Sequence, residues 1–211
     1  MEFEDYIDFH THHPSLGGER VIQDGVDTRG RHPWHLLPLL TPHPLPPAPI
    51  LAIGESGLDR LCQTPYDLQL RVFREEVRLS EERHLPLFLH CVRAIDDVLH
   101  IRKELRARQP WIWHGYRGNA QQLRQLLKLS EQALLPSGGA GKGAFYFSFG
   151  PRFNTEALLA CPADRLLLET DEDTQHPIAD LYAKVACLRG ISIDELIRQM
   201  HQNFHTLFGE D

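Results

Sequence analysis

The chain has 211 residues, of which 42% are hydrophobic, and this size and composition suit one ordinary globular domain over residues 1–211. A formal net charge of −7 argues against a protein coated with basic residues for broad nucleic-acid binding. No stretch approaches the roughly 18 apolar residues of a membrane span, so we expect no membrane association.

The cysteine content indicates a reducing environment. The four cysteines are Cys62, Cys91, Cys161 and Cys187, and no two of them form a C-x-x-C pair. The opening residues lack the basic and apolar segments of a secretory leader. We therefore expect a cytoplasmic protein with buried free thiols.

Short apolar runs alternate with helical patterns along the chain, which is typical of repeated βα units and a parallel sheet. Several runs are apolar almost throughout, as expected for strands that are covered on both faces. The predicted strands are Asp5–His12, Gln23–Arg29, Pro49–Glu55, Pro86–Cys91, Trp111–Tyr116, Ala144–Phe149 and Leu166–Asp171. A full (β/α)₈ barrel typically needs about 250 residues, so any barrel formed by this chain must be shortened.

The predicted helices lie between and after these strands. Thr64 and Pro65 predict an N-cap and first helical residue, for a helix that runs to about Arg83. Apolar residues at three- and four-residue spacing predict further helices after the fourth and fifth strands. The remaining boundaries are Asn119 as an N-cap, Pro177–Arg189 as a helix, and Ser192 with Glu195 as a capping box for a last helix ending at Gly209.

Two segments interrupt this alternation. Residues 38–49 hold six prolines, which predicts an extended connector. Residues 136–143 read PSGGAGKG and resemble a phosphate-binding loop only superficially, because the spacing, the last residue and the following strand do not fit that motif. We interpret this second segment as a surface loop.

The first predicted strand presents two histidines on one face. Side chains alternate along a strand, so His10 and His12 point the same way, and Ile7 and Phe9 point the other way. Two imidazoles so placed can bind one metal ion. Alone, the HTHH stretch fits a polar loop start equally well.

The same kind of residue ends four other predicted strands. Glu55 ends the stretch AIGE, His90 ends LPLFLH, His114 ends WIWH and Asp171 ends LLLETD. In a TIM-type barrel the carboxyl ends of all strands meet on one face, where active sites lie. Burial of so many titratable groups without an ion would be costly, so we expect a metal site there.

At these residues the sequence resembles the TatD family of metal-dependent hydrolases. The matching stretches are IDFHTHH (7–13), GRHPWH (30–35), IGESGLDR (53–60), LPLFLHCVRA (85–94), WIWHGYRG (111–118), FYFSFG (145–150), LLLETDED (166–173) and NFHTLFG (203–209). The resemblance implies a TIM-type barrel and the hydrolysis of phosphoesters, commonly at DNA ends. It also implies a two-metal site made of His10, His12, Glu55, His90, His114 and Asp171.

The sequence departs from the family pattern in four places. Only about 17 residues separate His12 from GRHPWH, too few for the usual intervening elements, so we expect one βα unit to be missing and seven parallel strands to remain. Arg93 and Arg117 stand where the family commonly has an acidic and a small polar residue, and TDAP reads TDED. These changes keep the metal-ligand residues of the family, but they leave the identity of the substrate undecided.

The residues suggest roles for this site. Two divalent ions, with Zn or Mn favoured and Mg possible, would be bridged by Glu55. His10 and His12 would hold one ion, and His90 and His114 the other. Asp171 would ligate the first ion and accept a proton from the attacking water. The expected substrate-binding residues are Arg93, Arg117, His13, His32 and Asp59. Trp34, Tyr116 and Phe149 could stack on a base, but aromatic residues in such places more often line the core.

Several alternatives stay open from the sequence. The arginines could pair with nearby acids such as Asp96, Asp97 or Glu172, and Asp59 could either orient a histidine or pair with an arginine. The substrate could be a nucleic acid or small phosphoester, or instead a different ester, a lactone or an amide. The chain could also be a metal-binding, non-catalytic subunit that contacts a protein partner through its Pro-rich connector or Gly-rich loop.

Overall fold

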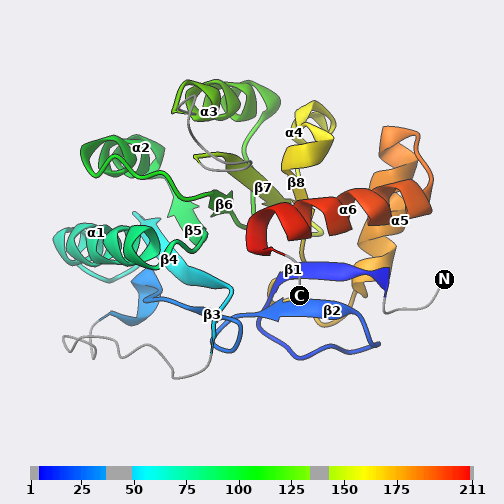
Figure 1. Cartoon of the computed structure of the whole chain (residues 1–211), viewed down its shortest axis with the longest axis horizontal. Coiled ribbons are helices and arrows are strands. Elements are labelled where there is room, and N and C mark those ends of the chain that lie inside the picture. The colour runs from blue at the N-terminus through cyan, green and yellow to red at the C-terminus, as the bar shows by residue number, and fades with distance from the viewer. Residues whose placement is uncertain (1–4, 37–48, 134–142, 210–211) are drawn as a thin grey trace.

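Parallel strands form the centre of the molecule, and the helices lie around them (Figure 1). The computed structural model describes residues 5–36, 49–133 and 143–209. Most of the Pro-rich connector and of the PSGGAGKG loop lie outside these ranges. The strands are β1 (Ile7–Thr11), β2 (Arg20–Gln23), β3 (Thr28–Arg29), β4 (Ala52–Asp59), β5 (Leu87–Val92), β6 (Trp111–Trp113), β7 (Phe145–Phe149) and β8 (Leu166–Leu168).

The strands pair in chain order, and every pairing is parallel. β3 to β8 form one six-stranded sheet, and β1 pairs with β2. The segment after β8 then meets β1, because the Asp171 N–H donates to the His10 carbonyl at 2.9 Å and the His12 N–H donates to the Asp171 carbonyl at 3.1 Å. The first and last strands are thereby joined, which gives the predicted shortened TIM-type barrel.

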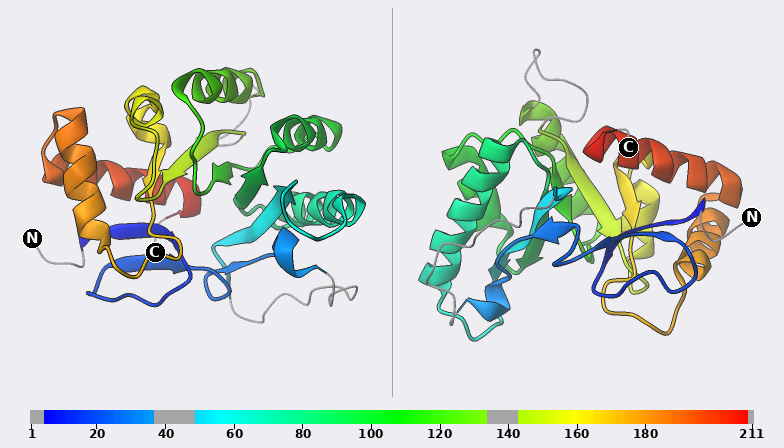
Figure 2. Two further views of the ribbon diagram at one scale, coloured as in Figure 1. Left: turned by 180° about the vertical axis from the view of Figure 1, so that it is seen from behind. Right: turned by 60° about the horizontal axis from the view of Figure 1, so that its bottom comes forward.

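Helices follow most of the strands and cover the outside of the sheet (Figure 2). The α-helices are α1 (Tyr66–Arg83), α2 (Ile95–Glu104), α3 (Ala120–Ala133), α4 (Thr155–Ala160), α5 (Ile178–Arg189) and α6 (Ile193–Phe208). Two 3₁₀ helices, η2 (Pro33–His35) and η3 (Ala163–Arg165), lie in connections. Phe9 of β1 faces this outer layer, with its ring 6.2 Å from that of Phe204 in α6.

The predicted strand Gln23–Arg29 is two short strands in the structure. A turn separates them, with Gly25 at φ +76° and the Gln23 N–H donating to Asp27 Oδ2 at 2.8 Å. β2 pairs with β1, and β3 pairs with β4. The two short strands therefore take the place of one strand between β1 and β4. Eight short strands are thus described where seven were predicted. Residues 12–19, which link β1 to β2, contain no helix, as expected for a missing βα unit.

Strand β4 continues four residues beyond the predicted end at Glu55, through SGLD to Asp59. This extension needs glycine at position 57, because a Cβ there would lie 1.8 Å from the His90 carbonyl oxygen of β5. The backbone of β5 therefore leaves no room for a side chain at position 57, and β4 holds Glu55 in its middle.

The predicted helix caps are correct at two of three positions. The Asn119 side chain accepts the Gln122 N–H at 2.9 Å, and Ser192 accepts the Glu195 N–H at 3.1 Å. The Thr64 prediction is wrong, because Pro65 occupies the cap position of α1 and no side chain in the described part of the structure caps this helix.

The cysteines are all free thiols, as predicted, but they are not all buried. Cys161 is buried, whereas Cys187 is exposed because it lies on the outer face of α5. Among the described helices, none combines the length and the apolar character that crossing a membrane requires.

Candidate metal centre

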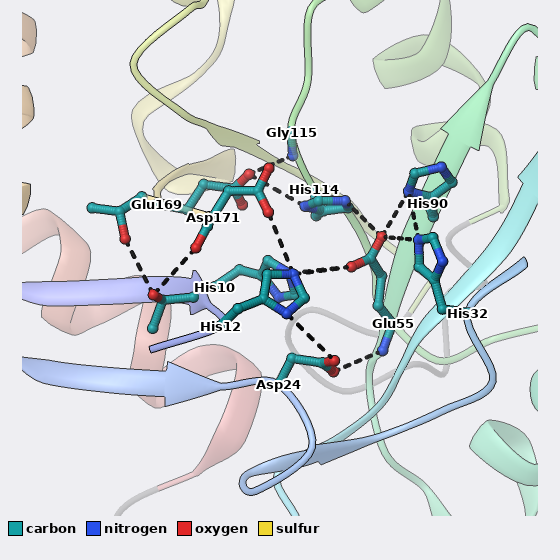
Figure 3. Close-up of polar contacts among 12 residues, drawn as sticks. His10, His12, Asp24, His32, Glu55, His90, His114, Gly115, Glu169 and Asp171 are labelled. Carbon is teal, nitrogen blue, oxygen red and sulfur yellow. Dashed lines mark hydrogen bonds and ion pairs between the residues drawn. The ribbon is translucent and has the colours of Figure 1, made fainter. Parts of the chain in front are cut away.

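Glu55 lies at the centre of a cluster of histidines (Figure 3). Its Oε1 atom is 2.6 Å from His90 Nδ1 and 2.9 Å from both His32 Nε2 and His114 Nε2. His90 belongs to β5, His114 follows β6, and His32 immediately precedes η2. Three separate segments therefore bring an imidazole to the same carboxylate oxygen.

The other oxygen of Glu55 faces the histidines of the first strand. Oε2 lies 3.3 Å from His10 Nε2 and 3.8 Å from His12 Nε2. His12 Nε2 is also 3.5 Å from Asp171 Oδ1. The alternation of β1 thus points both histidines toward the cluster, as the sequence predicted. The six predicted ligand residues lie together, within β1, β4 and β5, directly after β1 and β6, and in the segment after β8; they are His10, His12, Glu55, His90, His114 and Asp171.

Three overlapping groups of these side chains have the spacing of metal ligands. Within each group, one ligand atom per residue lies within 4.8 Å of the others. The groups are His10, His114 and Asp171; His10, His12 and Glu55; and His32, Glu55 and His90. His32, predicted to contact substrate, therefore lies among the candidate ligands, and His114 approaches the His10 side as well as Glu55.

The residues present fit a divalent cation. Both ring nitrogens of His10 are buried and neither has a hydrogen-bond partner among the described residues, although Nε2 lies 3.3 Å from Glu55 Oε2; this is costly for an ordinary core histidine. His32 Nε2 and His90 Nδ1 lie 3.2 Å apart beside the same carboxylate oxygen. Imidazole nitrogens and carboxylate oxygens converging in this way are typical ligands for Zn²⁺ and similar ions.

Opposite charges set the pKa values in the centre of the cluster. Burial works to raise the pKa of Glu55, but the positive charge of His114 and the contact with His10 hold it well below its ordinary value. Burial works to lower the pKa of His114, but the charges of Glu55 and Glu169 hold it well above. Glu55 is therefore a carboxylate at neutral pH, the form that ligates a metal.

The pKa values at the edge of the cluster have similar causes. The contact with Asp171 raises the pKa of His12. Burial works to raise the pKa of Asp171, but the contact with His12 and the charge of His114 keep it below its ordinary value, so Asp171 is ionised. Burial lowers the pKa of His32 and outweighs its contact with Glu55, which favours the neutral imidazole that binds metals.

Asp59 contacts a candidate ligand from the side away from Glu55. Its Oδ2 atom lies 3.3 Å from His90 Nε2. The arginines considered as alternative partners are engaged elsewhere, because Arg31 pairs with two glutamates of α1 and Arg60 pairs with an aspartate of α2. Asp59 is therefore placed to fix the orientation of the His90 ring.

Two further carboxylates support the cluster and were not predicted. Glu169, which is fully buried, accepts the Gly115 N–H at 2.6 Å and lies 3.3 Å from His114 Nδ1. Asp24, in the turn after β2, accepts the Glu55 N–H at 3.1 Å. Glu169 thus contacts the candidate ligand His114, and Asp24 fixes the backbone of the candidate ligand Glu55.

A buried carboxyl group joins the strands that carry the cluster. Asp8 of β1 accepts hydrogen bonds from the backbone N–H of Thr170, at 3.0 Å, and from its hydroxyl. Burial raises the pKa of Asp8 to about 7. The contact ties the segment before Asp171 to β1, which fixes Asp171 relative to His10 and His12.

A cleft of about 670 Å³ opens beside the cluster. Asp171 and Glu169 line it, so it communicates with the candidate ligands. Its lining also includes Arg117, Arg152 and Lys184, three cations from the segments after β6 and β7 and from α5. Arg117 is exposed there.

The other predicted substrate residues lie in different places. Arg93 borders a groove lined by α2 and α3, and none of the six predicted ligands borders that groove in the described part of the chain. His13 borders a smaller pocket of about 200 Å³ next to Thr11 and Thr170. For Arg93 and Arg117, the described residues provide no ion pair, so the alternative pairing with neighbouring acids is not observed.

The fold and the site together define a TIM-type barrel with a candidate metal centre at the carboxyl ends of its strands. The chain belongs to the TatD family, since the family model described as TatD related DNase matches residues 45–209. A solved structure of YJJV, a TatD homolog from Escherichia coli, has the same fold, with a TM-score of 0.75 at 21% identity over 99% of this chain and 100% of that chain.

Curated relatives show the same family. The chain is 30% identical to YabD of Bacillus subtilis, described as an uncharacterized metal-dependent hydrolase, over 75% of this chain and 65% of YabD. It is 31% identical to the 3'-5' ssDNA/RNA exonuclease TatD of Klebsiella pneumoniae, over 77% of this chain and 66% of that protein. The match thus spans slightly less than two thirds of each relative.

Proposed function

We propose that this protein is a metal-dependent hydrolase that cleaves phosphoesters, and that it is a nuclease acting at DNA ends. One observation supports this most strongly: the two oxygens of Glu55 face separate sets of histidines. Oε1 faces His32, His90 and His114, and Oε2 faces His10 and His12. A carboxylate in this position suits a bridge between two ions. The name of the Klebsiella pneumoniae relative, an exonuclease for single-stranded DNA and RNA, agrees with this activity.

We propose two divalent ions in this centre. His10, His12 and Asp171 would hold one ion, and His90 and His114 would hold the other, with Glu55 shared. His32 stands next to the second position, 2.9 Å from Glu55 Oε1. The imidazole-rich set favours Zn or Mn, with Mg possible, because Mg²⁺ prefers shells of oxygen ligands.

When bound, such ions supply a water that is deprotonated near neutral pH and neutralise charge on the phosphoryl oxygens. Asp171 is the residue of this chain that would accept the proton of that water. Its lowered pKa keeps the carboxylate ionised, and its position on the wall of the cleft gives access to substrate. His12, 3.5 Å away, stabilises the ionised form.

The cleft supplies a path for the substrate backbone. Arg117 is exposed on its wall, and its forked donors suit a phosphate oxygen. The net charge of −7 makes such local cations important, because the rest of the surface repels a polyanion. We therefore propose that nucleic acid is bound mainly at this cleft.

The experiment compares metal-stripped and metal-reloaded protein on end-labelled single-stranded DNA, duplex DNA and bis-p-nitrophenyl phosphate. We expect nucleotide release that depends on metal and is abolished by Glu55→Gln or Asp171→Asn. Glu82→Gln on the exposed face of α1 is the matched control and should behave as wild type. If the reloaded protein leaves all three substrates intact but cleaves carboxyl esters, lactones or amides, or turns over nothing, the nuclease proposal is wrong.

A further inference from the structure

Trp34 is an exposed tryptophan beside the candidate metal centre. It lies on η2 and 51% of its surface is accessible, although a large aromatic side chain is normally buried. The other two tryptophans of the chain, Trp111 and Trp113, are 0% and 3% exposed. Its exposure therefore requires an explanation that core packing does not provide.

The indole ring is held in place by its polar edge. Its Nε1–H donates to Asp59 Oδ2 at 2.7 Å, and Asp59 in turn contacts His90. The Trp34 backbone N–H also donates to His32 Nδ1 at 3.2 Å. A ring fixed in this way loses little conformational entropy when a ligand stacks on it.

The Trp34 ring lies next to two histidines of the cluster. Its ring centroid lies 4.9 Å from that of His32 and 5.7 Å from that of His90, and both histidines contact Glu55. The interplanar angles are 87° and 79°, so neither imidazole is stacked parallel to the indole. The stacking position on the exposed part of the ring is therefore not taken by either histidine.

The other two aromatic residues considered as surfaces for a base are largely or fully buried. Tyr116 is 6% exposed and Phe149 is fully buried, and both rings pack against each other in the core. Of the three aromatic side chains that the sequence suggested for stacking, Trp34 has by far the largest exposed surface, although Tyr116 reaches the wall of the Asp171 cleft with a small part of its side chain.

We propose that Trp34 is the stacking platform for an unpaired nucleobase next to the scissile phosphate. This inference rests on the proposed nuclease function. It states that one side chain, Trp34, gives the enzyme a preference for single-stranded ends. A base in a duplex is already stacked and paired, so it cannot lie on the indole without being unstacked first. A strand whose bases have been removed gains nothing from the ring.

Binding is tested by intrinsic fluorescence with metal-stripped protein. Because Trp111 and Trp113 are buried, we expect an oligothymidylate to quench mainly Trp34, and we expect little quenching by an abasic strand of the same length. The quenching should disappear in Trp34→Leu. Quenching that persists in Trp34→Leu, or that the abasic strand produces equally, would overturn the proposal.

Kinetics separate stacking from a purely structural role through Asp59. Trp34→Phe removes the N–H that bonds Asp59 but keeps an aromatic face, whereas Trp34→Leu removes both. We expect Trp34→Leu to raise KM for single-stranded DNA about tenfold, the usual size of a lost base stack, and to lower kcat/KM on an abasic strand of the same length much less. Trp34→Phe should restore most of the affinity for DNA.

Equal losses in both variants and on both substrates would show that Trp34 acts only by holding Asp59. Leu188→Ala, which removes an exposed apolar side chain on α5, is the control and should change neither constant. Failure of the nuclease proposal has a different signature, because wild-type protein would then cleave no DNA at all. Cleavage without Trp34-dependent quenching would overturn the stacking inference alone.

Discussion

His90 is contacted on both of its ring nitrogens, by Glu55 Oε1 at 2.6 Å from Nδ1 and by Asp59 Oδ2 at 3.3 Å from Nε2. A carboxylate on the nitrogen away from the metal fixes the ring orientation and makes the ligand more basic. Asp59→Asn should therefore lower metal affinity by about 10- to 100-fold, the usual cost of losing such a partner. Titration of stripped protein with Zn²⁺ or Mn²⁺ measures this change.

The control for that measurement is Glu82→Gln, a carboxylate-to-amide change on the exposed face of α1. It should bind metal as wild type does. Unchanged metal affinity in Asp59→Asn would mean that His90 is oriented by its backbone alone, or that it is not a ligand.

Arg117 and Arg93 should differ in their effect on substrate binding. Arg117 lines the cleft that includes Asp171, whereas Arg93 borders the groove between α2 and α3. A charge-assisted bond to phosphate contributes about 1.5–3 kcal/mol, so Arg117→Ala should raise KM for single-stranded DNA by roughly tenfold or more. It should also make the salt dependence of KM less steep, because one phosphate contact is lost.

Arg93→Ala is the matched variant and should change KM and its salt dependence much less. Steady-state kinetics over a series of salt concentrations provides both quantities. Equal effects from the two arginines would contradict the assignment of the substrate path to the Asp171 cleft.

The convergence of the ligands was predictable because it follows from topology. Parallel strands place their carboxyl ends on one face, so His90, His114 and Asp171 had to meet once their strands were recognised. The β1 histidines were predictable from side-chain alternation alone. The same alternation places Glu169, two residues before Asp171, on the same face as Asp171. The contact between Glu169 and His114 could therefore have been predicted from the sequence.

Other features depended on contacts that no local pattern encodes. His32 reaches Glu55 from a short segment before η2, and the path of such a segment is set by packing. Asp24 lies in a turn that divides a predicted strand. The extension of β4 through Gly57 was missed because glycine disfavours strands, while here it permits the close approach of β5.

Gly57→Ala should be strongly destabilising for that reason. The added Cβ would lie 1.8 Å from the His90 carbonyl oxygen, and a backbone atom between two strands cannot move away freely. We expect a loss of at least about 3 kcal/mol in the free energy of unfolding, together with weaker metal binding as His90 shifts. Urea denaturation and metal titration provide the two measurements.

Gly190→Ala is the comparison. Gly190 ends α5 at φ +66° with no atom within 4 Å of an added Cβ, so only backbone strain of about 1–2 kcal/mol should result, with normal metal affinity. If Gly57→Ala costs no more than Gly190→Ala, β4 and β5 are not as close as described.

The contact between Tyr66 and Asp97 should make stability depend on acidic pH. The Tyr66 hydroxyl donates to Asp97 Oδ2 at 2.6 Å, and this bond, followed by the contact with Arg60, lowers the pKa of Asp97. A carboxyl group with a lowered pKa in the folded state stabilises the fold above its unfolded pKa of about 3.9 and loses that contribution as the pH falls through the folded pKa.

Tyr66→Phe should therefore lower the free energy of unfolding by about 1 kcal/mol at neutral pH, the usual value of one hydrogen bond, and this difference from wild type should shrink below about pH 4. Urea denaturation over a pH series measures the difference. Tyr146→Phe is the control, because the buried Tyr146 hydroxyl has no hydrogen-bond partner among the described residues, and its effect should not change with pH in that range. A Tyr66→Phe effect that grows in acid would have the wrong sign for a bond to an ionised Asp97.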